Sequence, residues 1–112
     1  MYYIENKNKT MTKEKSQQLT KAFRQLRKLG YFAKRKLACC RSCAYYEIPD
    51  DKQNLYVYTS YNEEQLKKEG IDYLYWSAPN DDASEIIKVL KANNIKATWN
   101  KDPNTAIKID LN

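Results

Sequence analysis

Three cysteines lie within five positions of this 112-residue chain, in the run Cys39-Cys40-Arg41-Ser42-Cys43. Cys40 and Cys43 have the C-x-x-C spacing that supplies half of a structural zinc site. The chain contains no histidine and no second C-x-x-C pair, so the remaining ligands would be carboxylates or groups from a second chain. A zinc site is therefore one interpretation of this run.

The same cysteines suit a redox-active thiol pair, because the run falls between an expected strand and an expected helix. A helix N-terminus and the nearby cations Arg35, Lys36 and Arg41 would favour a thiolate over a thiol. A third interpretation is structural: the three cysteines are small buried residues that pack the helix against the sheet, as cysteines outside disulfides often do. The sequence favours this packing interpretation over the other two.

Common catalytic motifs are absent from the sequence. Without histidine the chain lacks the usual general base, the commonest metal ligand and every Ser-His or Cys-His pair. Gly30 and Gly70 are its two glycines, whereas a P-loop or a G-x-G-x-x-G turn needs several glycines so that backbone N–H groups can approach phosphate. We therefore expect a protein without catalytic activity and without a cofactor, although an enzyme stays open as an alternative.

The formal net charge of the whole chain is +6, and the positive charge is concentrated in its first part. Residues 1–43 contain twelve Lys and Arg against two Asp and Glu, a net +10, whereas residues 44–112 contain eight against twelve, a net −4. Such asymmetry between two halves indicates an anionic partner. If the halves fold against each other, their charges partly cancel.

The strongest candidate site is a basic face on the first expected helix. On a helical wheel Lys21, Arg24 and Lys28 fall in one stripe, opposite the apolar positions. This stripe and its neighbours can neutralise several phosphates, so nucleic acid is the favoured partner and an acidic protein surface the second. A solvated helix face without a partner is the alternative, since no helix-turn-helix, zinc-finger or ribonucleoprotein signature accompanies the stripe. The candidate binding residues are Lys13, Lys21, Arg24, Arg27, Lys28, Lys34, Arg35 and Lys36.

Tyrosine is abundant, with ten in the chain. Tyrosine rings offer stacking platforms for bases. They also fill the face of a sheet, which the alternation Tyr56-Val57-Tyr58 indicates for at least one side of a strand. The tyrosines that we consider as platforms are Tyr2, Tyr3, Tyr31, Tyr45, Tyr46, Tyr56, Tyr58 and Tyr61.

The elements that position these residues begin with a helix after a loose start at residues 1–10. We expect Thr12 to be its N-cap and Gly30 its C-terminal stop. A strand is expected over residues 31–37 and a short helix within residues 38–48, ended by Pro49. The apolar positions of the first helix recur at three- and four-residue steps, at Leu19, Ala22, Phe23, Leu26 and Leu29.

The second part of the chain alternates strands and helices. Strands are expected over residues 55–59 and 71–77, the latter in a central position, with a polar helix over residues 62–69 between them. Asp82 is expected to cap the next helix, with Glu85 completing a capping box. Residues 95–99 and 106–111 form a final pair of strands.

This order predicts a single α+β domain over residues 1–112, in which helices pack on a small mixed sheet of about four or five strands in two layers. A thin α/β sandwich is the alternative. No apolar run approaches the roughly 20 residues that a membrane span needs, and the start of the chain lacks the order of a signal peptide. Because a clustered, odd number of cysteines is a poor disulfide framework, we expect a cytoplasmic protein.

The chain resembles a small bacterial family of unknown function. The resemblance rests on Tyr31-Phe32, on the cysteine run 39–43, on the strand Tyr73-Leu74-Tyr75-Trp76, and on Trp99 followed by Asp102-Pro103-Asn104-Thr105-Ala106-Ile107. The family pattern has glycine after the third cysteine, where this chain has Ala44, so the local backbone can differ. The resemblance implies a compact α+β fold and carries no activity, cofactor or partner with it.

The sequence therefore favours a small basic binding protein that engages an anionic partner through its N-terminal helix. A thiol or zinc protein centred on Cys39, Cys40 and Cys43 is the alternative class. The size and charge would also suit a small protein of a bacterium or phage.

Overall fold

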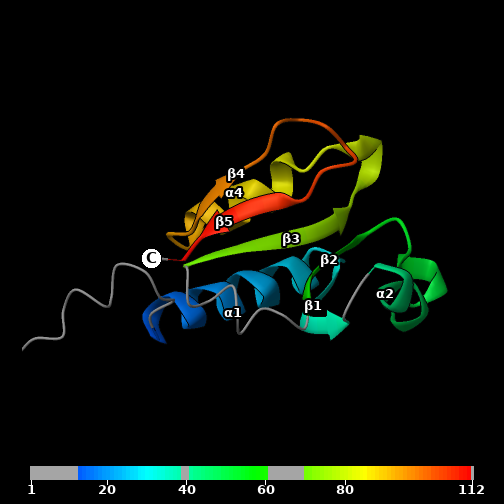
Figure 1. Cartoon of the computed structure of the whole chain (residues 1–112), viewed down its shortest axis with the longest axis horizontal. Helices are drawn as coiled ribbons and strands as arrows, with labels where there is room; N and C mark the ends of the chain where they lie inside the picture. Colours follow the sequence, from blue (N-terminus) through cyan, green and yellow to red (C-terminus); the bar gives the residue numbers. More distant parts are fainter. Residues whose placement is uncertain (1–12, 39–40, 61–69, 112) are drawn as a thin grey trace, which may run out of the picture.

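The computed structural model describes residues 13–38, 41–60 and 70–111 of the chain (Figure 1). Three regular α-helices, five strands and two 3-10 turns occur in this part of the chain. Their order is α1 (Lys13–Lys28), β1 (Phe32–Ala38), α2 (Arg41–Glu47), η2 (Asp50–Lys52), β2 (Tyr56–Ser60), β3 (Ile71–Ser77), η3 (Pro79–Asp81), α4 (Ser84–Ala92), β4 (Lys96–Thr98) and β5 (Ile107–Asp110).

The five strands form one mixed sheet in the order β1-β2-β3-β5-β4. The β1–β2 pair is parallel, and the β2–β3, β3–β5 and β4–β5 pairs are antiparallel. The predicted α+β class with a small mixed sheet is confirmed. The central position expected for residues 71–77 is also confirmed, because β3 lies between β2 and β5.

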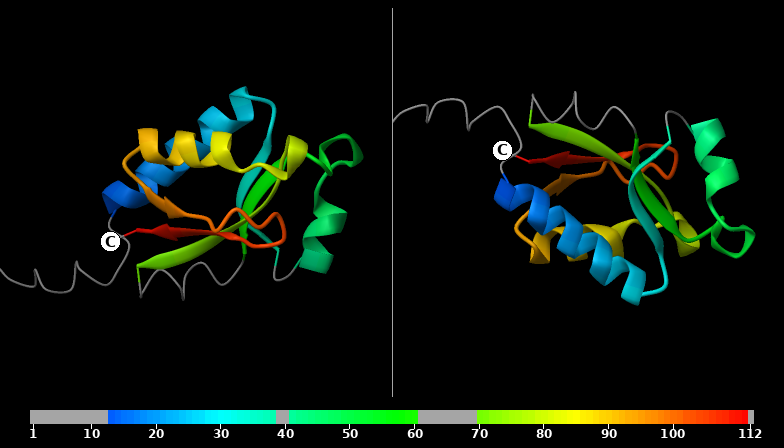
Figure 2. Two further views of the ribbon diagram at one scale, coloured as in Figure 1. Left: turned by 90° about the horizontal axis from the view of Figure 1, so that it is seen from above. Right: turned by 90° about the horizontal axis from the view of Figure 1, so that it is seen from below.

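Helices α1 and α4 lie side by side on one face of the sheet, and α2 sits at one end of it, away from them (Figure 2). The main core lies between the sheet and helices α1 and α4. It includes Leu19, Phe23, Leu26, Val57, Leu74, Trp76, Ile86, Leu90, Ile107 and Ile109. A smaller cluster packs α2 against the other face, with Leu37, Ala38, Ala44, Ile48 and Tyr58. None of the described helices is long and apolar enough to cross a membrane.

Glycine ends α1 as expected. Gly30 adopts φ +103°, a left-handed conformation that glycine tolerates without a steric penalty. The N–H of Tyr31 donates to the carbonyl of Leu26 at 3.0 Å, and the N–H of Gly30 donates to Arg27 at 3.0 Å. This pair of hydrogen bonds is a Schellman motif, which satisfies carbonyls that the helix leaves without partners.

Strand β1 contains an irregularity that changes which face its side chains occupy. The pairing with β2 shifts between Lys34 and Ala38, and Lys36 has φ 56°. Its N–H donates to Thr59 Oγ1 at 2.8 Å. As a result Ala33 packs in the main core under α1, whereas Leu37 packs in the smaller cluster beside α2. In a regular strand two residues four positions apart would share one face.

Two expectations about the helices are wrong. Leu29 was expected on the apolar face of α1 but is 49% exposed, because the helix ends at Lys28. Glu85 was expected to complete a capping box with Asp82. Instead Asp82 Oδ1 accepts from the N–H of Ser84 at 2.9 Å and from its hydroxyl at 2.6 Å, and Glu85 accepts from the hydroxyl of Tyr31.

Several expectations lie outside the described residues. They are the loose start at residues 1–10, the N-cap at Thr12, the helix over residues 62–69, and the side chains of Tyr2, Tyr3, Cys39, Cys40 and Tyr61.

The contact between Tyr31 and Glu85 joins the start of β1 to α4. Tyr31 is only 4% exposed, and its hydroxyl donates to Glu85 Oε1 at 2.9 Å. Burial raises the pKa of Tyr31 well above its usual value, and the hydrogen bond to Glu85 and the nearby carboxylates raise it further. The neutral phenol is therefore part of the folded state.

Because the unfolded chain releases the Tyr31 proton at a lower pH than the folded protein, this group stabilises the fold below about pH 10, and its contribution is lost as the pH rises above that value. We expect the free energy of unfolding to fall between pH 9 and 11 by about 1 kcal/mol more in the wild type than in Tyr31→Phe. Urea denaturation at several pH values measures this difference. Parallel pH profiles for the two proteins would contradict the assignment.

Candidate functional site

Four of the eight predicted binding cations share the outer side of α1. Lys13, Lys21, Arg24 and Lys28 are exposed, on the side of the helix opposite its buried residues. Within the described residues, Lys21, Arg24 and Lys28 form no hydrogen bond or ion pair. Glu14 is the acidic residue of the first turn. The outer side of α1 therefore presents positive charge to solvent, as the helical wheel predicts.

Arg27 and Arg35 instead join α1 to β1. Arg27 Nε donates to the carbonyl of Ala33 at 2.9 Å. Arg35 is half-buried, and its Nη1 donates to the carbonyl and hydroxyl of Ser16 at 3.2 and 3.1 Å and to the hydroxyl of Thr20 at 3.0 Å. Both guanidinium groups therefore have a structural role that a count of charges does not reveal.

Lys34 and Lys36 are placed apart from the α1 stripe. Both are exposed, and Lys36 occupies the irregular position of β1. Lys34 lines an open depression of about 600 Å³ along the outer edge of β1, together with Arg27 and Lys52. The structure therefore places four of the predicted residues on the outer side of α1, and Arg27 and Lys34 together at a separate depression.

Helix α4 adds cations that the sequence analysis did not assign. Lys88 and Lys91 are exposed on α4, which lies next to α1. Asn93 Nδ2 donates to Gln25 Oε1 at 2.9 Å across the two helices. Counting charge by halves of the chain hides these lysines, because they belong to the acidic half. The periodicity of α4 predicts that both lysines are exposed, but only the packing of α4 in the fold places them beside β4.

Only one cysteine lies within the described part of the chain. Cys43 is exposed on α2, so the packing interpretation is wrong for this residue. The described residues contain no group of three or more Cys, His, Asp or Glu side chains that could hold a metal ion. The redox and zinc interpretations stay predictions.

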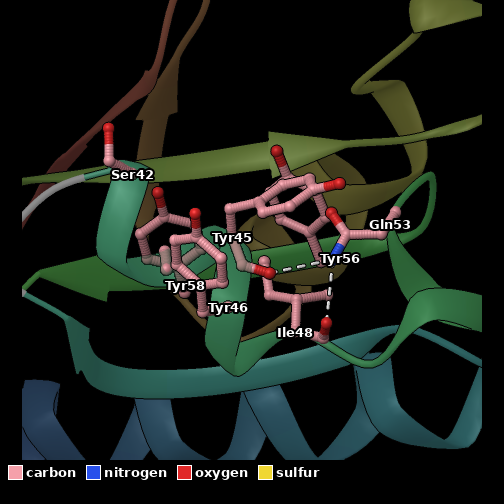
Figure 3. Close-up of a pocket in the computed structure, with 8 residues that line it drawn as sticks. Ser42, Tyr45, Tyr46, Ile48, Gln53, Tyr56 and Tyr58 are labelled. Carbon is pink, nitrogen blue, oxygen red and sulfur yellow. Dashed lines mark hydrogen bonds between the residues drawn. The ribbon is translucent and has the colours of Figure 1, made fainter.

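A pocket of about 430 Å³ lies between α2 and the end of β2 (Figure 3). Its walls are largely tyrosine, and Gln53 fixes its shape by donating to the carbonyls of Tyr45 and Ile48 at 3.0 and 2.8 Å. The residues that line it are Ser42, Ala44, Tyr45, Tyr46, Ile48, Gln53, Tyr56 and Tyr58.

The tyrosines considered as stacking platforms differ in accessibility. Tyr31 and Tyr58 are buried, whereas Tyr45 and Tyr46 are 61% and 84% exposed. Tyr58 stacks on Tyr56 and on Tyr75, with ring centroids 5.8 and 5.3 Å apart. The exposed pair is flanked along the chain by the carboxylates of residues 47, 50 and 51. A phosphate group is therefore less favoured beside these rings than beside α1.

Fold and surface together define a small α+β protein with exposed cations on α1 and α4. The chain belongs to the family of the domain of unknown function DUF6891, whose family model matches residues 4–112. This confirms the expected resemblance to a family of unknown function. No curated protein and no solved structure matches the chain.

The different roles of the arginines can be tested by stability. We expect Arg35→Ala to lower the free energy of unfolding by about 1–2 kcal/mol, because three hydrogen bonds between β1 and α1 are lost. Arg24→Ala removes an exposed side chain of the same type and should change stability by less than about 0.5 kcal/mol. Urea denaturation compares the two variants, and equal losses would contradict a structural role for Arg35.

Proposed function

We propose that this protein is a non-catalytic nucleic-acid-binding protein whose binding surface is the outer side of the α1–α4 layer. The observation that carries the proposal is the exposed line of Lys21, Arg24 and Lys28, which have no partner among the described residues. Lys88 and Lys91 are further exposed cations on the neighbouring helix.

The spacing of these cations suits a phosphate backbone. Residues three and four positions apart lie on adjacent turns of a helix, with a pitch of roughly 5.4 Å. Lys21, Arg24 and Lys28 therefore present charges at regular intervals along the helix. Each phosphate that such a side chain neutralises releases a condensed counterion, and this release provides most of the free energy of non-specific binding.

The surface is less suited to an acidic protein partner. A protein interface usually has an apolar core in which aromatic residues are enriched and lysine is depleted. Among the described residues, the exposed large hydrophobic side chains are Leu29, which adjoins α1, and Tyr45, Tyr46 and Tyr73, which lie on α2 and β3. A lysine-rich face with one exposed leucine resembles a surface that binds a polyanion.

The proposal is tested with a fluorescein-labelled 20-nucleotide dT strand and a duplex of the same length. We expect the wild type to bind with an affinity that falls as salt rises. In Lys21→Gln/Lys28→Gln the affinity should fall about tenfold at 50 mM salt, and the slope of log K against log salt should fall by about 1.4 for the single strand. Fluorescence anisotropy measures both quantities.

Lys96→Gln/Lys108→Gln is the matched control. It removes the same number of positive charges from exposed positions of β4 and β5. In the sheet Lys96 lies opposite Asp110 and Lys108 lies opposite Tyr73, on the face of the sheet away from α1. This variant should bind like the wild type. Equal weakening by the two variants would show that only net charge matters, and no binding at low salt would reject the proposal in favour of an acidic protein partner.

A further inference from the structure

A groove of about 530 Å³ runs along the side of α4 that faces the β4 end of the sheet. Ile87 and Ala97 supply its apolar part, and Trp99 forms an aromatic wall. Lys88, Lys91 and Lys101 line the same groove, and all three are exposed. An aromatic wall ringed by cations is an environment for a ligand that is both planar and anionic.

Trp99 is held in place before any ligand arrives. Its ring meets that of Trp76 edge-to-face, with centroids 5.3 Å apart and an interplanar angle of 88°. Its Nε1 donates to the carbonyl of Asp102 at 2.9 Å. Trp76 is itself buried and donates to the carbonyl of Thr105 at 2.9 Å. A ring fixed in this way loses little conformational entropy when a second ring stacks on it.

The charge of the groove is positive on balance. Asp82 and Asp102 are the carboxylates near the groove, against three lysines that line it. The pKa of Asp82 is lowered by hydrogen bonds from the hydroxyl and N–H of Ser84, with a smaller contribution from the charge of Lys101. Asp82 therefore stays ionised and offsets part of the charge of Lys101. Within the described residues, Lys88 and Lys91 form no hydrogen bond or ion pair.

We propose that this groove binds a base of single-stranded nucleic acid, stacked on Trp99, while Lys88 and Lys91 contact the phosphates on either side of that base. The inference rests on the proposed function and makes it more specific. The lysines of α4 are exposed and line the groove. A strand whose backbone they hold can therefore place a base on Trp99. A duplex keeps its bases stacked inside, so the groove favours single strands.

The tyrosine pocket is the other aromatic site, and its charges argue against the same ligand. Three lysines line the groove with Trp99, whereas the described residues that line the tyrosine pocket include no lysine or arginine. Base stacking is tolerant of sequence, but it needs a positive surface nearby to hold the backbone. Of these two sites, the groove beside α4 is the one that combines both features.

The test compares two probes of equal charge: a 20-nucleotide dT strand and a 20-unit abasic deoxyribose-phosphate strand. We expect dT to bind about tenfold more tightly than the abasic strand and to quench tryptophan fluorescence, which the abasic strand does not do. Trp99→Leu should remove both differences, and Trp99→Phe should keep most of the preference for dT. Tyr46→Leu is the control for an exposed aromatic residue away from the lysines and should behave like the wild type.

Thermal unfolding of each variant shows whether it folds, and Lys88→Gln/Lys91→Gln provides a second variant that alters only exposed side chains. We expect this variant to bind dT about tenfold less tightly. Equal affinity for dT and the abasic strand, with unchanged tryptophan fluorescence, would overturn the inference and leave backbone binding intact. Failure of both strands to bind at low salt would reject both proposals. Quenching by dTMP without binding of the dT strand would also overturn it, in favour of a pocket for free nucleotides.

Discussion

The burial of one side of α1 against the sheet is the constraint on which the rest of the structure depends. Leu19, Phe23 and Leu26 are almost completely buried, and each such side chain stabilises the fold by about 1.5–3 kcal/mol. Like charges three or four residues apart on the opposite side repel each other by only about 0.2–0.5 kcal/mol per pair. Burial therefore decides how the helix is rotated, and the cations are left facing solvent. Stability therefore does not require these cations on one side of the helix, and the anionic partner that we propose would account for their accumulation there.

The attachment of β1 to α1 depends on cations of the same charge run, used in a different way. Arg35 reaches the hydroxyls of Ser16 and Thr20, and the irregularity at Lys36 turns the strand directly after it. This turn sends Leu37 to the opposite face, where it packs beside α2. One short basic segment therefore joins the two hydrophobic clusters of the protein. Arginine suits this position because its planar group donates several hydrogen bonds at once, which lysine does in a less fixed geometry.

The sequence predicts the parts of this protein that repeat with a regular period. The helical period of α1, the alternation of Ile107 and Ile109, and the glycine stop at Gly30 are local signals, and the structure contains all three elements. The positive φ of Lys36 has no such signal, because lysine rarely adopts it and tertiary contacts impose it here. Glu85 illustrates the same limit. The helix begins at Ser84 with Ala83 as its N-cap, so Glu85 is not in the register of a capping box with Asp82, and it accepts instead from the hydroxyl of Tyr31.

The candidate site divides in the same way. The stripe on α1 follows from a helical wheel, whereas the contribution of Lys88, Lys91 and Lys101 follows only from the packing of α4 beside α1 and the β4 edge.

The aromatic residues show why packing matters for function. Tyrosine outnumbers tryptophan by ten to two in the sequence, which directs attention to tyrosine as a platform for bases. The fold reverses this preference, because it buries Tyr31 and Tyr58 and leaves the exposed Tyr45 and Tyr46 in an acidic stretch of chain. Trp99 entered the sequence analysis only as part of a family resemblance, yet it lies beside lysines of α4 and of the segment that follows β4. The distribution of charge therefore favours Trp99 as the platform for a base, whereas amino-acid composition alone favours the tyrosines.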